Sequence, residues 1–263
     1  MPKVSIIMSV HNENVDFLKK SMESVLRQSY ADFEFLIIND GSEKETSDIL
    51  EKIAQNDPRV VLLQNDHNIG LTKSLNIGIR KSQGEFIARM DSDDISLHDR
   101  IEKQLAFLLD NNLDLIGSDC DIINEKENIL KKKRVALPKN IKKALFKGNF
   151  FTHSTFFGKR KVFKELYNEN FKRSQDYEFL LRIVGKGYEL GYMSENVLKY
   201  RVNANGISAK SSKQQEFYAL KARLLALSRY GYDYLLFPHI FKPLMSFLLP
   251  YKLKHYIIYR IQK

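Results

Sequence analysis

The sequence predicts an α/β protein built around a largely parallel sheet, and three observations support this class. Short apolar runs alternate with helix-length amphipathic segments through the first half of the chain. The apolar runs are almost continuous, as in strands that helices cover on both faces. The length of 263 residues, with 43% hydrophobic residues, is enough for one full core.

The first half is expected to alternate strictly between strand and helix. Apolar runs predict strands at 4–10, 33–39, 59–65, 85–91 and 113–118. Amphipathic segments predict helices at 15–28, 44–56, 71–82 and 97–111. Ligands of such sheets bind at the carboxyl ends of the strands. The polar residues that follow each strand should therefore converge at one edge: His11 to Glu13, Asp40 to Ser42, Asn68, and Asp91 to Asp94.

The second half loses this alternation. A strand is expected at 149–158, a helix at 174–187 that ends at a glycine, and another strand at 196–203. From about Ser211 the pattern is helical to the end. We interpret the basic run at 131–134 as a solvated turn. These patterns predict one domain over residues 1–210, with halves at 1–118 and 119–210, followed by a helical, basic segment at 211–263.

Composition restricts the compartment and the partners. A single cysteine, Cys120, excludes an intramolecular disulfide and a multi-cysteine zinc site, so the chain suits a reducing compartment such as the cytoplasm. The N-terminus shows no secretion signal. The net charge of +10 leaves nucleic acid, anionic lipid or a phosphorylated small molecule as partners. Part of this excess is C-terminal, because no acidic residue follows Asp233.

The stretch FIARMDSDD crowds carboxylates behind a strand, which costs free energy unless a cation lies among them. In an extended strand Arg89, Asp91 and Asp93 share one face. Carboxylate oxygens at this spacing suit magnesium or manganese, which also takes phosphate oxygens from a substrate. In the alternative interpretation, Asp93 or Asp94 merely caps the helix expected from Leu97, and this is the favoured role for Asp94 or Ser96.

Three other strand ends carry weaker signals. Asp40 is either an acceptor for a nucleobase imide N–H or only part of a turn before Gly41. His11 could stack on that base, or be an ordinary polar residue at a strand end. Asn68 and Lys73 place a loop and a cation near a helix N-terminus, where phosphate binds favourably.

Five motifs in one order, over about residues 3–205, resemble glycosyltransferase family 2 of the kind that builds bacterial cell-surface polysaccharides. The motifs are VSIIMSVHNE, FLIINDGS, NIGLTKSLNIGI, GEFIARMDSDD and SQDYEFLLRI. The resemblance implies an inverting enzyme with the GT-A fold, a Rossmann-like nucleotide-binding sheet with helices on both faces, here followed by a C-terminal helical segment. Residues 1–118 would then bind the nucleotide-sugar and 119–210 the acceptor.

The resemblance also implies roles for single residues. Asp91 and Asp93 match the D-x-D motif, which holds ribose and a metal, Mn²⁺ or Mg²⁺, on the donor diphosphate. Asp40 matches the position that binds the base, usually uracil, and Asp176 matches the catalytic base. The donor-binding residues implied in this way are Val10, His11, Glu13, Asp40, Asn68, Lys73, Arg89, Asp91 and Ser92.

Two departures from the family pattern leave roles open. Gln175 stands where the family often has glutamate, and Asn203 stands where many members have a histidine near the diphosphate. His153 is either an acceptor-side residue or a core residue. The chain has no tryptophan, so it lacks the Q-x-x-R-W signature of processive members. With no long membrane span either, transfer of one sugar at a time is expected, from a UDP-sugar to a glycan or lipid-linked acceptor.

The C-terminal stretch at 234–263 is expected to lie on an anionic membrane at the inner face of the cell membrane. Aromatic residues alternate there with basic residues, and its charge-free stretches are far shorter than the ~20 residues of a membrane span. Alternatively it packs on the catalytic domain or on a second copy in a homodimer.

A nucleic-acid-binding protein would not place carboxylates at strand ends. A dinucleotide-dependent oxidoreductase would need a G-x-G-x-x-G turn, which the first strand lacks.

Overall fold

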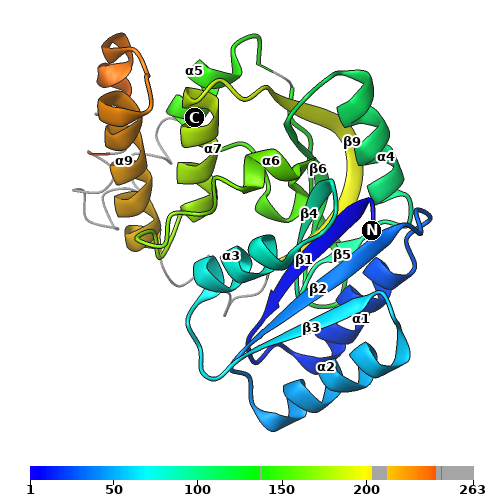
Figure 1. Cartoon of the computed structure of the whole chain (residues 1–263). Coiled ribbons are helices and arrows are strands. Elements are labelled where there is room, and N and C mark those ends of the chain that lie inside the picture. Colours follow the sequence, from blue (N-terminus) through cyan, green and yellow to red (C-terminus); the bar gives the residue numbers. More distant parts are fainter. Residues whose placement is uncertain (137, 203–211, 241–243, 245–263) are drawn as a thin grey trace.

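The computed structural model describes residues 1–136, 138–202, 212–240 and 244, which form an α/β fold around one nine-stranded sheet (Figure 1). The strand order is β3-β2-β1-β4-β8-β6-β9-β5, and β7 pairs with β6 outside this path. The predicted fold class is confirmed. The boundary proposed at 118/119 between the two halves of the domain falls inside strand β6 (Leu115–Ile123) of this continuous sheet.

The first half contains four parallel strands joined by helices, close to the predicted bounds. The strands are β1 (Val4–Val10), β2 (Phe33–Asp40), β3 (Val60–Asn65) and β4 (Phe86–Asp91). The connecting helices are α1 (Val15–Leu26), α2 (Lys44–Asn56) and α3 (Leu71–Lys81). In the register of β1, Ser9 lies beside Asp91 and Val10 beside Asn39. The carboxyl ends of β1, β2 and β4 therefore lie together.

The second half adds strands of mixed direction. They are β5 (Ile95–Ser96), β6 (Leu115–Ile123), β7 (Ile129–Lys133), β8 (Phe157–Lys159) and β9 (Leu190–Arg201). The helices are α4 (Arg100–Asp110), α5 (Ile141–Lys147), α6 (Arg160–Phe163), α7 (Gln175–Gly185) and α9 (Ser212–Arg229), with 3-10 turns η1 (His153–Thr155) and η2 (Tyr234–Ile240). β8 is antiparallel to both β4 and β6, so it joins the two halves.

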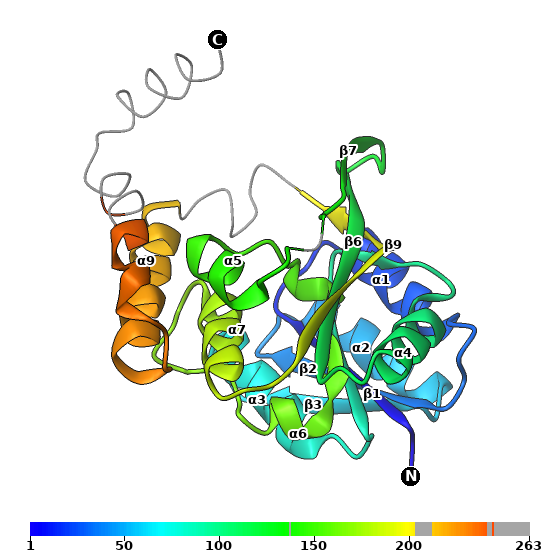
Figure 2. The ribbon, with the colours of Figure 1, turned by 90° about the horizontal axis from the view of Figure 1, so that it is seen from above.

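Helices cover both faces of the sheet because successive strand residues point to opposite sides. In β1, Ile6 and Met8 pack into one core cluster and Ile7 packs into the other. The first cluster includes residues of α1, α2 and α4, and the second includes residues of α3, α5, α6, α7 and α9. Figures 1 and 2 show α9 alongside α7 on the outside of the second layer.

The strand predicted at 149–158 is wrong over most of its length, because only Phe157–Lys159 is a strand. Residues 149–156 instead form a loop that contains the turn η1. Thr155 accounts for the turn: its backbone N–H and its hydroxyl both donate to the Thr152 carbonyl, at 2.9 and 2.8 Å. Threonine side chains that bond nearby backbone compete in this way with sheet pairing.

Three other predicted boundaries need correction. The helix expected from Leu97 begins at Arg100, so neither Asp94 nor Ser96 caps it. Residues 196–201 of the strand predicted at 196–203 form the second half of the longer β9. The basic run at 131–134, predicted as a turn, is mostly in strand β7, although its first residues are exposed as expected. Among the described residues, no helix is long and apolar enough to cross a membrane.

Candidate active site

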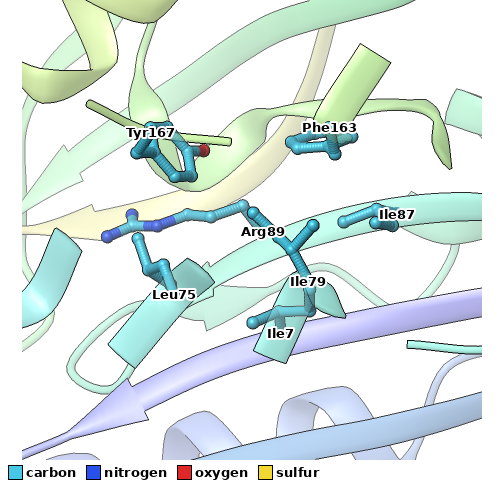
Figure 3. A pocket seen from close by; sticks show the side chains of 7 residues that line it. All are labelled: Ile7, Leu75, Ile79, Ile87, Arg89, Phe163 and Tyr167. Atoms are coloured by element: carbon cyan, nitrogen blue, oxygen red, sulfur yellow. The ribbon is translucent and has the colours of Figure 1, made fainter. Parts of the chain in front are cut away.

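Asp91, the last residue of β4, is held in place from two sides. Arg89 makes a two-pronged ion pair with its carboxylate. The Ser154 hydroxyl donates to Asp91 at 2.8 Å and accepts from Arg89 at 3.0 Å. The Arg89 side chain is only 4% exposed. Its stem borders a small cavity lined by Ile7, Leu75, Ile79, Ile87, Phe163 and Tyr167 (Figure 3). Arg89 therefore holds the Asp91 carboxylate in place.

Asp93 follows Asp91 in a turn, not on the strand face that the sequence argument gave to Arg89, Asp91 and Asp93, and Asp94 comes directly after it. The turn nevertheless brings carboxylate oxygens of Asp91, Asp93 and Asp94 within 4.8 Å of one another. Burial, with the nearby charges of Asp91 and Glu13, raises the pKa of Asp93 to about 7. Burial, with the nearby charges of Asp91 and Asp93, raises the pKa of Asp94 well above its ordinary value.

Asp94 is a site residue that the sequence interpretation assigned to a helix cap. It is fully buried, and its Oδ1 accepts from the backbone N–H of Arg201 at 2.8 Å. Its Oδ2 is buried without a hydrogen-bond partner. A hard divalent cation binds carboxylate oxygens as ligands. Asp94 Oδ2, which is buried without a donor, and the neighbouring carboxylates of Asp91 and Asp93 provide such oxygens. The residues of this cluster thus fit Mn²⁺ or Mg²⁺.

Asp40, at the end of β2, accepts hydrogen bonds that fix the loop before α3. Its Oδ1 accepts from the Asn65 amide and from the backbone N–H of Ile69, and its Oδ2 accepts from the backbone N–H of Gly70, each at 2.9 Å. Oδ1 is therefore saturated, and Oδ2 keeps one acceptor position. The loop passes so close to β2 that a Cβ on Gly41 would lie 2.4 Å from the His67 carbonyl carbon.

His11 lies beside Asp40 at the end of β1. Its Nδ1 is 2.9 Å from the Asp40 carbonyl oxygen. Because a carbonyl only accepts, Nδ1 carries the proton in this contact. Asn68 is exposed in the neighbouring loop, and Lys73 is exposed in the first turn of α3.

The remaining predicted donor-side residues complete the same edge. Val10 is fully buried, and its carbonyl accepts from the Ser42 hydroxyl at 3.4 Å, so only its backbone faces the edge. The Ser92 hydroxyl donates to Glu13 Oε2 at 3.1 Å. The nine predicted donor-side positions all lie at the carboxyl ends of β1, β2 and β4, or in the loops and first helical turn that follow β1, β3 and β4.

Asp176 lies in the first turn of α7. Asn149 Nδ2 donates to Asp176 Oδ2 at 2.8 Å, and Asn149 Oδ1 accepts from the backbone N–H of Phe151 at 3.0 Å. This second bond fixes which end of the amide faces the carboxylate. Burial raises the pKa of Asp176, and the hydrogen bonds from the Tyr177 backbone and from Asn149 oppose that shift.

The segment at 149–155 connects Asp176 with the Asp91 cluster. Asn149 bonds Asp176, the Thr152 hydroxyl accepts from Lys133 Nζ at 2.8 Å, and Ser154 bonds Asp91. The sequence interpretation missed Asn149 and Ser154 because it assigned a strand here. Polar residues spaced through an otherwise aromatic run, NFFTHSTFF, were the available signal.

His153, in the same segment, is a partly buried residue with specific partners. Its Nε2 lies 2.8 Å from the Tyr167 hydroxyl, and its ring packs edge-on against Phe156 and Tyr167. Burial, and then the charge of Arg89, lower the pKa of His153 well below its ordinary value, so the ring is neutral. Asn203 lies outside the described residues.

Comparison with known proteins identifies a common family. The model of the family described as "Glycosyl transferase family 2" matches residues 5–167. An uncharacterised glycosyltransferase from Methanocaldococcus jannaschii is 36% identical over 228 residues, covering 84% of this chain and 79% of the relative. The O-antigen biosynthesis glycosyltransferase WbnJ from Escherichia coli is 34% identical over 206 residues, covering 76% and 80%.

Two solved structures share the fold at low sequence identity. Residues 1–349 of S. aureus TarS, solved in complex with UDP, superpose with a TM-score of 0.69 at 17% identity, covering 94% of this chain and 70% of that one. The mannosyltransferase PcManGT from Pyrobaculum calidifontis, solved with GDP-Man and Mn²⁺, superposes with a TM-score of 0.66 at 15% identity, covering 99% and 80%. At these identities the likeness concerns the fold alone.

Proposed function

The chain belongs to glycosyltransferase family 2, and from this premise we propose that it moves one sugar at a time from a nucleotide-sugar to a hydroxyl group of an acceptor. The observation that carries the proposal is that one segment, 149–155, contacts two groups of carboxylates. The crowded carboxylates of Asp91, Asp93 and Asp94 suit a metal diphosphate. Asp176, linked to them through the segment at 149–155, suits a catalytic base.

The proposed donor is a UDP-sugar. Asp40 Oδ2 keeps an acceptor position for the imide N–H of uracil, and the His11 ring beside it offers a face for stacking. Asn68 and Lys73, with the N-terminal turn of α3, would contact the phosphates or the ribose. Structures of the same fold contain UDP in TarS and GDP-mannose in PcManGT, so the identity of the base requires a direct test.

Asp93 and Asp94 would hold the divalent cation, with Asp91 contributing from its Arg89-bound carboxylate. The carboxylate oxygens, including the unpartnered Asp94 Oδ2, fit Mn²⁺ or Mg²⁺. When bound, such an ion supplies positive charge against the diphosphate. Arg89 and Ser154 keep Asp91 oriented for this contact.

The proposed reaction is a single in-line displacement. Asp176 takes the proton from the acceptor hydroxyl as its oxygen bonds to the anomeric carbon. The bond from that carbon to the diphosphate oxygen breaks on the opposite side, and the nucleoside diphosphate leaves with the bonding electrons. The anomeric configuration is therefore inverted. The raised pKa of Asp176 supports this role because it makes the carboxylate a stronger base.

The proposed setting is surface polysaccharide synthesis at the cytoplasmic face of the cell membrane, with a glycan or a lipid-linked acceptor. The similarity to WbnJ supports polysaccharide synthesis. The exposed side chains of Tyr234 and Leu235, at the start of the basic aromatic stretch, support a peripheral membrane contact. Most of that stretch, 241–263, lies outside the described residues apart from residue 244. Dimerisation through it is the alternative, and co-sedimentation with anionic liposomes of the full-length chain and of a version ending near Asp233 separates the two.

A donor screen tests the proposal. Purified protein is incubated with UDP-, GDP- and ADP-sugars in the presence of Mn²⁺, and release of the nucleoside diphosphate is measured. We expect release from one or more UDP-sugars, and its loss in chelator. A preference for GDP-sugars would overturn the role given to Asp40. No release from any donor, in the presence of glycan acceptors, would overturn the transfer reaction itself.

A further inference from the structure

The hairpin formed by β6 and β7 exposes two adjacent apolar side chains. Ile129 is 51% exposed and Leu130 is 59% exposed, at the start of β7. β7 pairs with β6 and with no other strand of the described residues. Soluble proteins usually protect an edge strand with charge or cover it, so an exposed apolar pair on such a strand indicates a contact surface.

The surroundings of this apolar pair are basic. Lys131 and Lys132 follow on β7, and Lys126 lies in the turn before it, all exposed. The acidic groups nearby are mostly neutralised: Glu127 is paired with Lys20, and Arg134 pairs with Asp121 at 2.7 Å. Glu125 is the remaining exposed acid of the turn. The tip of the hairpin thus combines apolar side chains with a net positive charge.

The hairpin lies at the same edge of the sheet as the candidate active site. β8 is antiparallel to both β4 and β6, so β4 and β6 run in the same direction and their carboxyl ends share an edge. The hairpin projects beyond this edge (Figure 2). At its base, Lys133 donates to Thr152, between the residues that bond Asp176 and Asp91. A partner that covers the tip would therefore lie in front of the active site.

We propose that this hairpin docks on the surface of an anionic lipid bilayer. Ile129 and Leu130 enter the headgroup layer, and Lys126, Lys131 and Lys132 contact lipid phosphates. Apolar insertion combined with cations is the pattern of proteins that bind in the plane of a membrane. The docked hairpin turns the active-site edge toward the membrane, where a lipid-linked acceptor would be presented. Docking itself is independent of glycosyl transfer, and only its use for the acceptor rests on the proposed function.

A second copy of the chain is the competing occupant, since edge strands also pair with one another. Two β7 strands side by side would place the lysines of one copy against those of the other. Like charges on neighbouring strands are destabilising. An anionic surface has the opposite charge, which is why the basic tip favours the bilayer.

The chain contains no tryptophan, so Leu130→Trp places the only indole at the tip of the hairpin. Its fluorescence is measured in the full-length protein with vesicles of phosphatidylcholine and phosphatidylglycerol, and with vesicles of phosphatidylcholine alone. Leu109→Trp is the matched control. Leu109 is 51% exposed at the end of α4, directly before β6, and hence at the opposite edge of the sheet. Ile129→Trp provides a second reporter at the tip.

The proposal predicts a blue shift of Leu130→Trp emission, and quenching by brominated lipid, with the anionic vesicles only. Leu109→Trp emission should not change. Adding Lys131→Gln or Lys132→Gln should weaken vesicle binding by about fivefold each. No shift at either tip position overturns the proposal, even where the protein co-sediments with vesicles through its C-terminal segment. A shift that appears without vesicles and grows with protein concentration assigns the surface to a second copy instead. Nucleoside diphosphate release by the same variants is the separate readout for the transfer reaction.

Discussion

The protein balances the charges of Asp93 and Asp94 less well than that of Asp91. Asp91 has Arg89 and Ser154, whereas burial and neighbouring carboxylates raise the pKa of both Asp93 and Asp94. A bound cation would remove this repulsion. The three residues lie within four positions of the sequence, but their environments differ.

Asp93→Ala should therefore lower metal-dependent turnover by more than about 10²-fold, because the charge against the diphosphate is lost. Asp91→Ala should have a smaller effect. The measurement is nucleoside diphosphate release across a titration of Mn²⁺. Wild-type activity that persists in chelator would contradict the metal assignment, and Asp48→Ala, an aspartate on α2 outside the cluster, is the control.

Asp176→Asn should lose transfer by about 10²–10⁴-fold and keep the affinity for the donor, since it removes a base without removing volume. Donor affinity is measured by calorimetry with the nucleoside diphosphate and Mg²⁺, and transfer is measured separately. A variant within about threefold of the wild-type rate would show that the base is another group.

Asn149 should set the pH dependence of transfer through Asp176. The base acts only when ionised, so activity falls as the pH drops through its pKa, which burial has already raised. The hydrogen bond from Asn149 stabilises the ionised form. Asn149→Ala should consequently raise the pKa further and move the acid limb of kcat/KM to higher pH. An unchanged limb, or one that moves to lower pH, would mean that Asn149 does not act on the base.

At the scale of elements, the alternation of apolar strands and amphipathic helices predicted the first half of the fold closely. Its helices and strands are stabilised by burial on both faces of the sheet. The periodicity of apolar residues in the sequence shows directly which residues are buried. The segment at 149–155 could not be predicted in this way. Its apolar residues are as dense as in a strand, but Thr152 and Thr155 close a turn that only the surrounding contacts make favourable.

The residues of the candidate site were also predictable only where they lie at the ends of predicted strands or helices. Asp40, Asp91 and Asp176 stand at strand or helix ends, where topology alone gathers polar groups. Asn149 and Ser154 come from a loop whose path depends on long-range contacts. The sequence argument also placed Asp93 correctly near Asp91 for a wrong reason, since a turn and not a strand face brings them together.

The packing of α9 gives a prediction at this scale. Arg223 is buried, and its guanidinium donates to the carbonyl oxygens of Phe146 and Lys147 at the end of α5, at 2.8 and 3.1 Å. Arg223→Met should lower the free energy of unfolding by about 1–3 kcal/mol, because these carbonyls lose charged donors. Urea denaturation measures the change, and Arg229→Met on the exposed side of the same helix should alter it little. A loss equal to that control would contradict the docking of α9 described here.

At the scale of the whole molecule, the net charge of +10 first suggested nucleic acid as one of several partners. The positions of the charged residues in the fold indicate the partners better than the net charge does. Carboxylates gather at the sheet edge where the donor is proposed to bind, and lysines lie on the neighbouring hairpin and along the C-terminal sequence. This separation suits a metal-bound diphosphate at the centre and an anionic surface around it.

The central claim is that a sugar is transferred in one displacement between the carboxylate cluster and Asp176. The most direct measurement is the anomeric configuration of the transferred sugar, determined by proton NMR on the first product formed from a donor of known configuration. The account predicts inversion, and predicts that Asp176→Asn abolishes formation of the inverted product. Retention of configuration, or an inverted product formed at an undiminished rate by Asp176→Asn, would contradict it.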